Sequence, residues 1–268
     1  VAHNNLAAAL NALGQYSSAI EHFQQALRIK SDYAEAHVNL GILLDMTGQP
    51  QEAIKHFEQA LQSDPENAEF HNNLGITLAK AGQAQKAIEH YEQALRYKPD
   101  YAKAHNNLGL ALSVEGPIEE AIKHFEQALR FKPDSAEIHN NLGIALAKAG
   151  QSQKAIEHYE QALRLKPDFA DAHNNLGLVL QKTGQLQEAI KHYKQALNLK
   201  PDFAEAYANL ALIYAQTNQP ADAIGMAEKA LSVARSKRQT AMAEQIEEWL
   251  NSYRASLSEL PSATPPAK

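Results

Sequence analysis

The sequence contains no cysteine, and this absence removes several kinds of chemistry at once. Without thiols the chain cannot form disulfides, attack a substrate through a thiolate, or hold zinc through cysteine ligands. No apolar run approaches the roughly 20 residues of a membrane span, and no apolar N-terminal segment of the signal-peptide kind is present. We therefore expect a cytoplasmic chain without membrane contacts.

Aromatic residues, at 7%, and positive charge are also scarce, with a formal net charge of −6. Nucleic-acid binding requires a basic face that neutralises phosphates, so this balance argues against a nucleic-acid partner. No phosphate-binding glycine loop, HExxH motif or nucleophile elbow appears. We expect no catalytic residue, no metal site and no cofactor, and therefore no enzyme.

The sequence is instead dominated by one repeated motif, His-Asn-Asn-Leu-Gly. Complete copies occupy 71–75, 105–109, 139–143 and 173–177, and altered copies occupy 3–7, 37–41 and 207–211. Consecutive copies lie 34 residues apart, a period typical of stacked supersecondary units. The array is predicted over 1–237, with a partial unit at 1–33 and units at 34–67, 68–101, 102–135, 136–169, 170–203 and 204–237.

Each unit carries two helical patterns. In the unit at 68–101, apolar residues recur at three- and four-residue spacing before Gly82, and a second apolar stripe ends before Pro99. Gly82 is expected to close the first helix in a left-handed conformation. The same is expected at Gly14, Gly48, Gly116, Gly150, Gly184 and, by substitution, Asn218.

Two further features predict how the helices meet. The glycine of each motif, as in Gly75, is expected at the crossing of the two helices, where it lets the backbones approach closely. The segments 134–137 and 202–205 (Asp-x-x-Glu) predict capping boxes at the start of the following helices.

The order of these residues resembles the tetratricopeptide repeat (TPR). His105, Leu108, Gly109, Leu112, Ala121, Phe125, Ala128 and Pro133 fall on its signature places. The resemblance implies an all-α, right-handed superhelical solenoid of antiparallel helix pairs. After it, 238–257 is expected to form a C-terminal capping helix, and 258–268 a disordered tail.

Twelve histidines form two columns, one on each helix of the repeat. Members of one column should lie at least roughly 8–10 Å apart, too far to share a metal ion. We interpret them as packing or surface residues, although a pair between the two columns of one unit stays open.

The asparagine before each buried leucine is expected to face the concave wall, where its amide can pair with a peptide backbone. This column resembles the asparagine ladder in the TPR superhelix of O-linked N-acetylglucosamine transferases, although asparagine here is also a common TPR residue. The predicted peptide-binding residues are Asn39, Asn73, Asn107, Asn141, Asn175 and Asn209, with Asn72, Asn106, Asn140 and Asn174 beside them and Lys80, Lys148 and Lys182 as donors. An apolar strip of Ile42, Ile76, Leu110, Ile144 and Leu178 is expected along the same wall.

These features predict a protein-interaction scaffold that binds an extended segment of a partner in its concave groove. An alternative is the substrate-recruiting arm of a larger, glycosyltransferase-like enzyme whose catalytic domain is absent from this chain. A second alternative is an architectural array that self-associates through its N-terminal face. Because Val1 already lies inside a repeat, further chain is expected before it.

Overall fold

The computed structural model of the protein describes residues 1–258, and every regular element within that range is an α-helix. The predicted tail at 258–268 lies outside the described residues except for Ser258, which ends the last helix. The helices are α1 (Ala2–Ala12), α2 (Tyr16–Ile29), α3 (Ala34–Met46), α4 (Pro50–Ser63), α5 (Ala68–Lys80), α6 (Ala84–Tyr97), α7 (Ala102–Glu115), α8 (Ile118–Phe131), α9 (Ala136–Lys148), α10 (Ser152–Leu165), α11 (Ala170–Lys182), α12 (Leu186–Leu199), α13 (Ala204–Gln216), α14 (Pro220–Ser236) and α15 (Thr240–Ser258).

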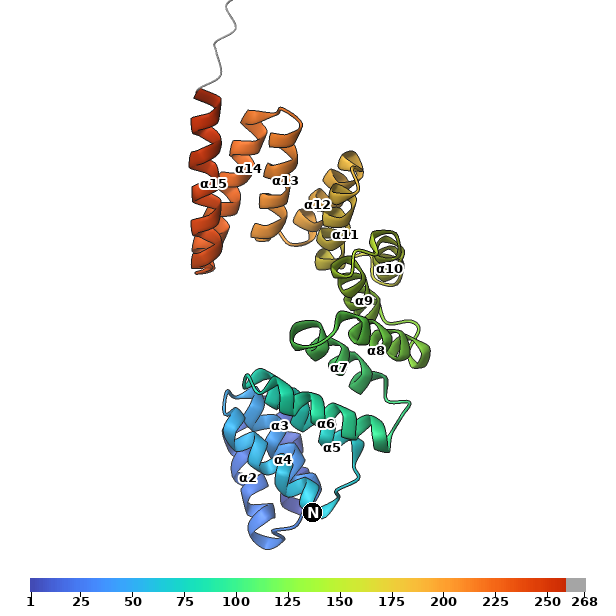
Figure 1. The fold of residues 1–268 in the computed structure, drawn as a ribbon. Helices are drawn as coiled ribbons and strands as arrows, with labels where there is room; N and C mark the ends of the chain where they lie inside the picture. Colours follow the sequence, from blue (N-terminus) through green and yellow to red (C-terminus); the bar gives the residue numbers. More distant parts are fainter. Residues whose placement is uncertain (259–268) are drawn as a thin grey trace, which may run out of the picture. The chain divides into compact units, whose positions relative to one another are not determined.

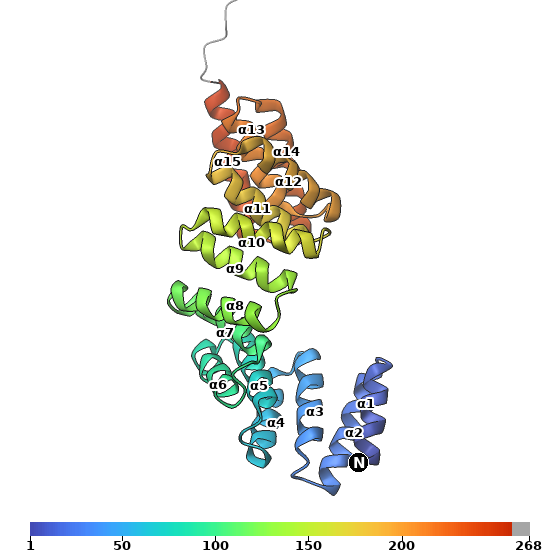
Figure 2. The ribbon, with the colours of Figure 1, turned by 90° about the vertical axis from the view of Figure 1, so that its right-hand side faces the viewer.

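The helices belong to two compact units, residues 1–149 and 150–268, and we describe each by itself. In the first unit, α1 packs on α2, α3 on α4, α5 on α6 and α7 on α8, followed by α9. In the second unit, α10 is followed by the pairs α11/α12 and α13/α14 and then by α15 (Figures 1 and 2). The predicted all-α solenoid of helix pairs is confirmed.

The crossing of the two helices in a repeat depends on a glycine facing an aromatic ring. A Cβ atom added to Gly75 would lie 2.6 Å from the Tyr91 ring, and one added to Gly109 would lie 2.8 Å from Phe125. These contacts are shorter than van der Waals distance, so only glycine lets the ring lie flat on the first helix. The expected role of the motif glycine is confirmed at these crossings.

The residue that ends the first helix of a repeat has the predicted left-handed conformation in most repeats, but not in one. Gly82 has a φ of 74°, and Asn218, which replaces glycine in the last repeat, has a φ of 57°. Gly116 instead is extended, with φ −130° and ψ −172°. The left-handed prediction for Gly116 is wrong because Pro117 follows it, and proline disfavours helical conformations in the residue before it.

The predicted capping boxes are also wrong, because the helices begin one residue later than the acids suggested. The residue before α9 is Ser135, whose hydroxyl oxygen accepts from the Ile138 N–H at 3.4 Å. The residue before α13 is Phe203, which cannot cap through its side chain. The proline–acid sequence therefore forms the turn between the helices, and the helix starts after it.

The last helix, α15, lies against α14, as Figure 1 shows in red and orange. Ala243, Ile246 and Leu250 of α15 are buried in a cluster with alanines of α14. Arg254 and Arg235 make ion pairs between the two helices at 2.5 and 2.8 Å. None of the helices within residues 1–258 combines the length and the apolar character that crossing a bilayer requires.

Candidate functional site: the asparagine face of the first helices

The first helices of neighbouring repeats contact one another directly. In the first unit these contacts join α1 to α3, α3 to α5, α5 to α7 and α7 to α9, and in the second unit they join α11 to α13. The predicted ladder residues lie on these helices, and all six are half-buried. They are Asn39, Asn73, Asn107, Asn141, Asn175 and Asn209.

Most ladder residues donate a hydrogen bond to an amide of the preceding repeat. Asn107 Nδ2 donates to Asn72 Oδ1 at 2.9 Å, and Asn141 Nδ2 donates to Asn106 Oδ1 at 3.0 Å. In the second unit, Asn209 donates to Asn174 at 3.1 Å. Asn107, Asn141 and Asn209 thus each donate one N–H to the preceding repeat, and their Oδ1 atoms accept no hydrogen bond within the described residues of their own units.

The acceptors of these bonds are the asparagines expected beside the ladder. Asn72, Asn106, Asn140 and Asn174 are only 2 to 8% exposed. A buried amide requires partners inside the protein, and three of these amides accept a hydrogen bond from the next repeat. This column therefore connects repeats to one another, and Asn72 and Asn106 also line a hollow of the same face.

Asn73 differs from the other ladder residues. The preceding repeat carries Val38 where the acceptor asparagine would stand, so Asn73 has no amide to which it can donate. Within residues 1–258, the Asn73 side chain forms no hydrogen bond. Both the donor and the acceptor of its amide are therefore available to a ligand.

Hollows along this face of the first unit surround Asn73. One of about 240 Å³ extends from Ile42 and Met46 to Asn73, and another of about 430 Å³ extends from Ile76 to Val114. A third, of about 320 Å³, contains both Asn73 and Asn107. Ile76 lines all three, so the hollows adjoin one another along this face, and we refer to them together as the groove.

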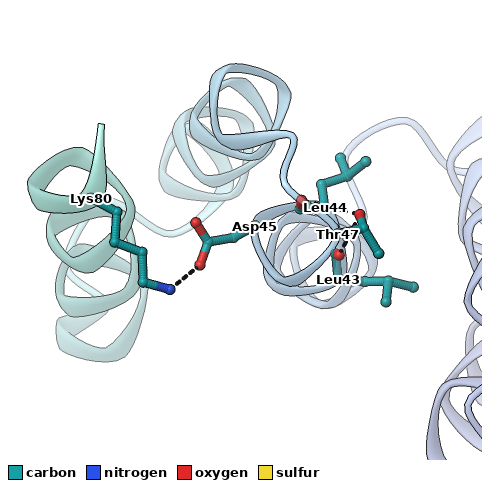
Figure 3. Close-up of polar contacts among 5 residues, drawn as sticks. All are labelled: Leu43, Leu44, Asp45, Thr47 and Lys80. Atoms are coloured by element: carbon teal, nitrogen blue, oxygen red, sulfur yellow. Dashed lines mark hydrogen bonds and ion pairs between the residues drawn. The ribbon is translucent and has the colours of Figure 1, made fainter. Parts of the chain in front are cut away.

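Two of the predicted lysine donors also bridge neighbouring repeats. Lys80 Nζ lies 2.5 Å from an oxygen of Asp45, whose side chain is only 10% exposed (Figure 3). Lys148 Nζ donates to the Ser113 carbonyl at 3.4 Å. Lys182 is exposed. The groove edge therefore carries a fixed cation at Lys80, whose charge the partly buried Asp45 offsets.

The histidines of the two columns do pair within repeats, an arrangement that the sequence left open. The Nδ1 atoms of His37 and His56 are 2.9 Å apart, and those of His173 and His192 are 3.0 Å apart. Nε2 of the first-helix histidine donates to a backbone carbonyl, Ser31 O for His37, so its Nδ1 must accept the partner's proton. The accepting ring is neutral in this arrangement, and the facing ring donates from Nδ1.

Burial favours the neutral state of the second-helix histidines. It lowers the pKa of His56, His124 and His192, with a smaller contribution from the facing histidine, and lowers the pKa of His90 to about 4. Glu52, one turn before His56, opposes the shift there. Within the described chain, no three potential metal ligands among histidine and acidic residues converge. The pairs are consistent with the expected packing role.

Solved structures with related sequences share this fold. MamA is 28% identical, with 62% of this chain and 97% of MamA aligned and a TM-score of 0.56. YrrB, described as a TPR protein with an unusual peptide-binding site, is 24% identical over 72% of this chain and 97% of its own, at a TM-score of 0.56. A tetratricopeptide repeat protein from Parabacteroides merdae is 18% identical over 94% and 97%, at 0.72.

No curated protein matches the sequence. Tetratricopeptide repeat families, however, match along nearly the whole array. One matches residues 1–66 and 168–236, a second matches 46–106, and a family described as TPR repeat matches 115–150 and 145–184. This fold is typical of protein–protein interaction scaffolds, and such scaffolds generally have no enzymatic activity. The chain belongs to the tetratricopeptide repeat family.

Proposed function

We propose that the protein is an interaction scaffold that binds an extended segment of a partner protein along its asparagine face. The observation that carries the proposal is Asn73, whose amide has no partner within the described residues and lies in a groove beside Ile76. One amide can accept a backbone N–H and donate to a backbone C=O of the same peptide. Recognition of this kind depends little on the peptide's side chains.

The neighbouring ladder residues extend the site. Asn107 and Asn141 each donate one N–H to the preceding repeat. This bond fixes the orientation of the side chain and leaves Oδ1 to accept from a peptide N–H. Preorganised side chains lose less conformational entropy when they bind. Ile42 and Leu110, 38 and 42% exposed, would contact apolar side chains of the segment. The peptide-binding site described for YrrB supports this use of the fold.

The experiment is a selection of random dodecapeptides displayed on phage against the full chain. Selected peptides are then measured by calorimetry against wild type, Asn73→Ala, and Asn73→Ala/Asn107→Ala/Asn141→Ala/Asn175→Ala. We expect about tenfold weaker binding for the single variant, equivalent to one lost charge-neutral bidentate contact of about 1.4 kcal/mol. The fourfold variant should lose binding, with its melting temperature measured in parallel to establish that it is folded.

A matched control removes amides from the second helices. Gln25→Ala/Gln59→Ala/Gln127→Ala/Gln195→Ala truncates four exposed amides that occupy one repeat position. This variant should bind the peptides like wild type. If it loses binding as much as the asparagine variant does, the first-helix groove is not the site.

A second candidate function is self-association, favoured by exposed apolar residues in and beside α1 and α2. Leu13 and Ile29 are 72 and 76% exposed, and Leu6 is 46% exposed. Large exposed apolar side chains at the first helix pair offer surface that a second copy of the chain could bury. Sedimentation equilibrium of wild type and Leu13→Asp/Ile29→Asp tests this. A mass that rises with concentration only in wild type would support it, and a monomer at every concentration would exclude it.

A further inference from the structure

The last repeat lacks the aromatic ring that fills the helix crossing in the others. Tyr193, for example, lies where a Cβ atom on Gly177 would come within 2.8 Å of the ring. One repeat later, the glycine position holds Ala211 and the ring position holds Ala227. Both alanines are buried, so the pair of helices α13 and α14 meets without the volume of a ring.

A cavity of about 210 Å³ lies at this crossing. Ala211 and Leu212 of α13 and Ala227 of α14 form one side, and Met242, Ile246 and Trp249 of α15 form the other. α15 therefore covers the crossing without filling the space of the missing ring. An apolar cavity of about 150 Å³ is already large enough to hold benzene in a protein interior. The cavity of the last repeat exceeds that size.

The cavity opens on the asparagine face. Leu212 is 43% exposed and holds the repeat position of Ile76 and Leu110, which line the groove of the first unit. Asn209, three residues before Leu212, occupies the same face of α13. Its Nδ2 donates to Asn174, and its Oδ1 is available in the described part of the second unit. A backbone held at Asn209 would place a neighbouring side chain at the cavity mouth.

We propose that this cavity receives an aromatic side chain of the bound segment. The inference rests on the proposed function and names the chemistry of the partner: an extended segment with a Phe, Tyr or Trp anchor. A ring is the expected occupant because the equivalent space in other repeats is filled by the chain's own Phe or Tyr. The walls are apolar except for Gln245, so a ring that enters replaces contacts missing from Ala227 and Trp249.

The first test uses p-cresol, the side-chain analogue of tyrosine, as the probe. Trp249 is the only tryptophan of the protein, so its single indole N–H resonance reports on the cavity. Titration with p-cresol should shift this resonance to saturation in the full chain. Ala211→Gly/Ala227→Tyr, which restores the crossing of the preceding repeat, should abolish the shift because its own ring occupies the space.

A second variant covers the case in which the added ring disturbs α15. Leu212→Asp changes an exposed residue at the mouth and should weaken p-cresol binding about tenfold. Leu199→Asp, a matched change at a leucine 36% exposed near the end of α12, should leave binding unchanged. An indole resonance that does not respond to p-cresol in wild type, or responds equally in all variants, would overturn the proposal.

The peptide selection separates this inference from the proposed function. Peptides selected on wild type should share an aromatic residue that Leu212→Asp no longer enriches. Peptides without an aromatic preference that still depend on Asn73 would overturn the inference and leave the groove intact. If no peptide is selected, the proposed function fails and the inference fails with it, whatever p-cresol does.

Discussion

The Nδ1 atoms of His71 and His90 lie 2.9 Å apart, so one ring must donate to the other. The Nε2–H of His71 donates to the Pro65 carbonyl at 3.0 Å, so the Nδ1 of His71 can only accept. A proton added to that Nδ1 would direct two N–H groups at one another. Burial, with a smaller contribution from the facing His71, lowers the pKa of His90 to about 4.

This pair predicts that stability falls in mild acid. The folded pKa of His90, about 4, lies below its ordinary value of 6.5. Between these values the unfolded chain binds more protons, so the stability present above pH 6.5 is lost as the pH falls towards 4. The lowered pKa values of His56, His124 and His192 act in the same direction. We expect the melting temperature to fall by several degrees.

The measurement is the melting temperature of wild type and His90→Gln across that pH range. The glutamine N–H can still donate to His71 Nδ1, but the side chain does not titrate. The difference in melting temperature between the variant and wild type should therefore shift in favour of the variant as the pH falls. Parallel curves for the two proteins would contradict the assignment of the shift to this pair.

Glycine substitutions should separate close packing from backbone freedom. Gly75→Ala places a Cβ atom 2.6 Å from the Tyr91 ring, and overpacking of this kind costs about 1–3 kcal/mol. Gly225 lies inside α14 with no atom within 4 Å of an added Cβ. Gly225→Ala should therefore stabilise the protein by about 0.5–1 kcal/mol through helix propensity. Urea unfolding of both variants checks these opposite signs, and a stable Gly75→Ala would refute the contact.

The repeat period was sufficient to predict the helix pairs and the crossing glycines. The conformation of Gly116, however, depends on the residue after it and could not be predicted from the repeat pattern alone. Pro117 stands directly after that glycine, so the signal was present in the sequence. The capping residues were misplaced for a different reason: helix starts depend on backbone geometry that a residue pattern locates only to within a residue or two.

The site was predicted less completely than the fold. Sequence spacing placed the asparagines on one face, but it treated two adjacent columns as equivalent. A helix turns by about 100° per residue, so Asn72 points between repeats while Asn73 points into the groove. The hydrogen bond that links Asn107 to Asn72 spans 35 residues and depends on how the repeats stack. The Val38 exception, in contrast, could have been recognised from the altered motif.

The ion pair between Lys80 and Asp45 should stabilise the stacking of two repeats. Asp45 is the less exposed partner, so Lys80→Met leaves a nearly buried carboxylate without its cation. We expect the free energy of unfolding to fall by about 1 kcal/mol at low ionic strength, as measured by urea unfolding. The double variant Asp45→Asn/Lys80→Met removes the unpaired charge as well and should recover part of that loss. An equal loss in both variants would show that packing, not charge, is responsible.

The most direct prediction compares two adjacent asparagines. Asn72 is 2% exposed and accepts from Asn107, so Asn72→Ala removes one side of a partly buried hydrogen bond and should cost about 1–3 kcal/mol. Asn73 forms no side-chain hydrogen bond within the described residues, so Asn73→Ala should stay within about 0.5 kcal/mol of wild type. Urea unfolding measures both variants under one set of conditions.

Val38→Asn extends this comparison, because it returns the acceptor that the second repeat lacks. If Asn73 then donates to the new amide, as Asn107 does to Asn72, peptide binding that depends on Asn73 should weaken while the fold is retained. A loss of stability in Asn73→Ala as large as that in Asn72→Ala would contradict the free amide. In that case the ladder would be a structural connection in this repeat as well, and the groove proposal would lose its principal contact.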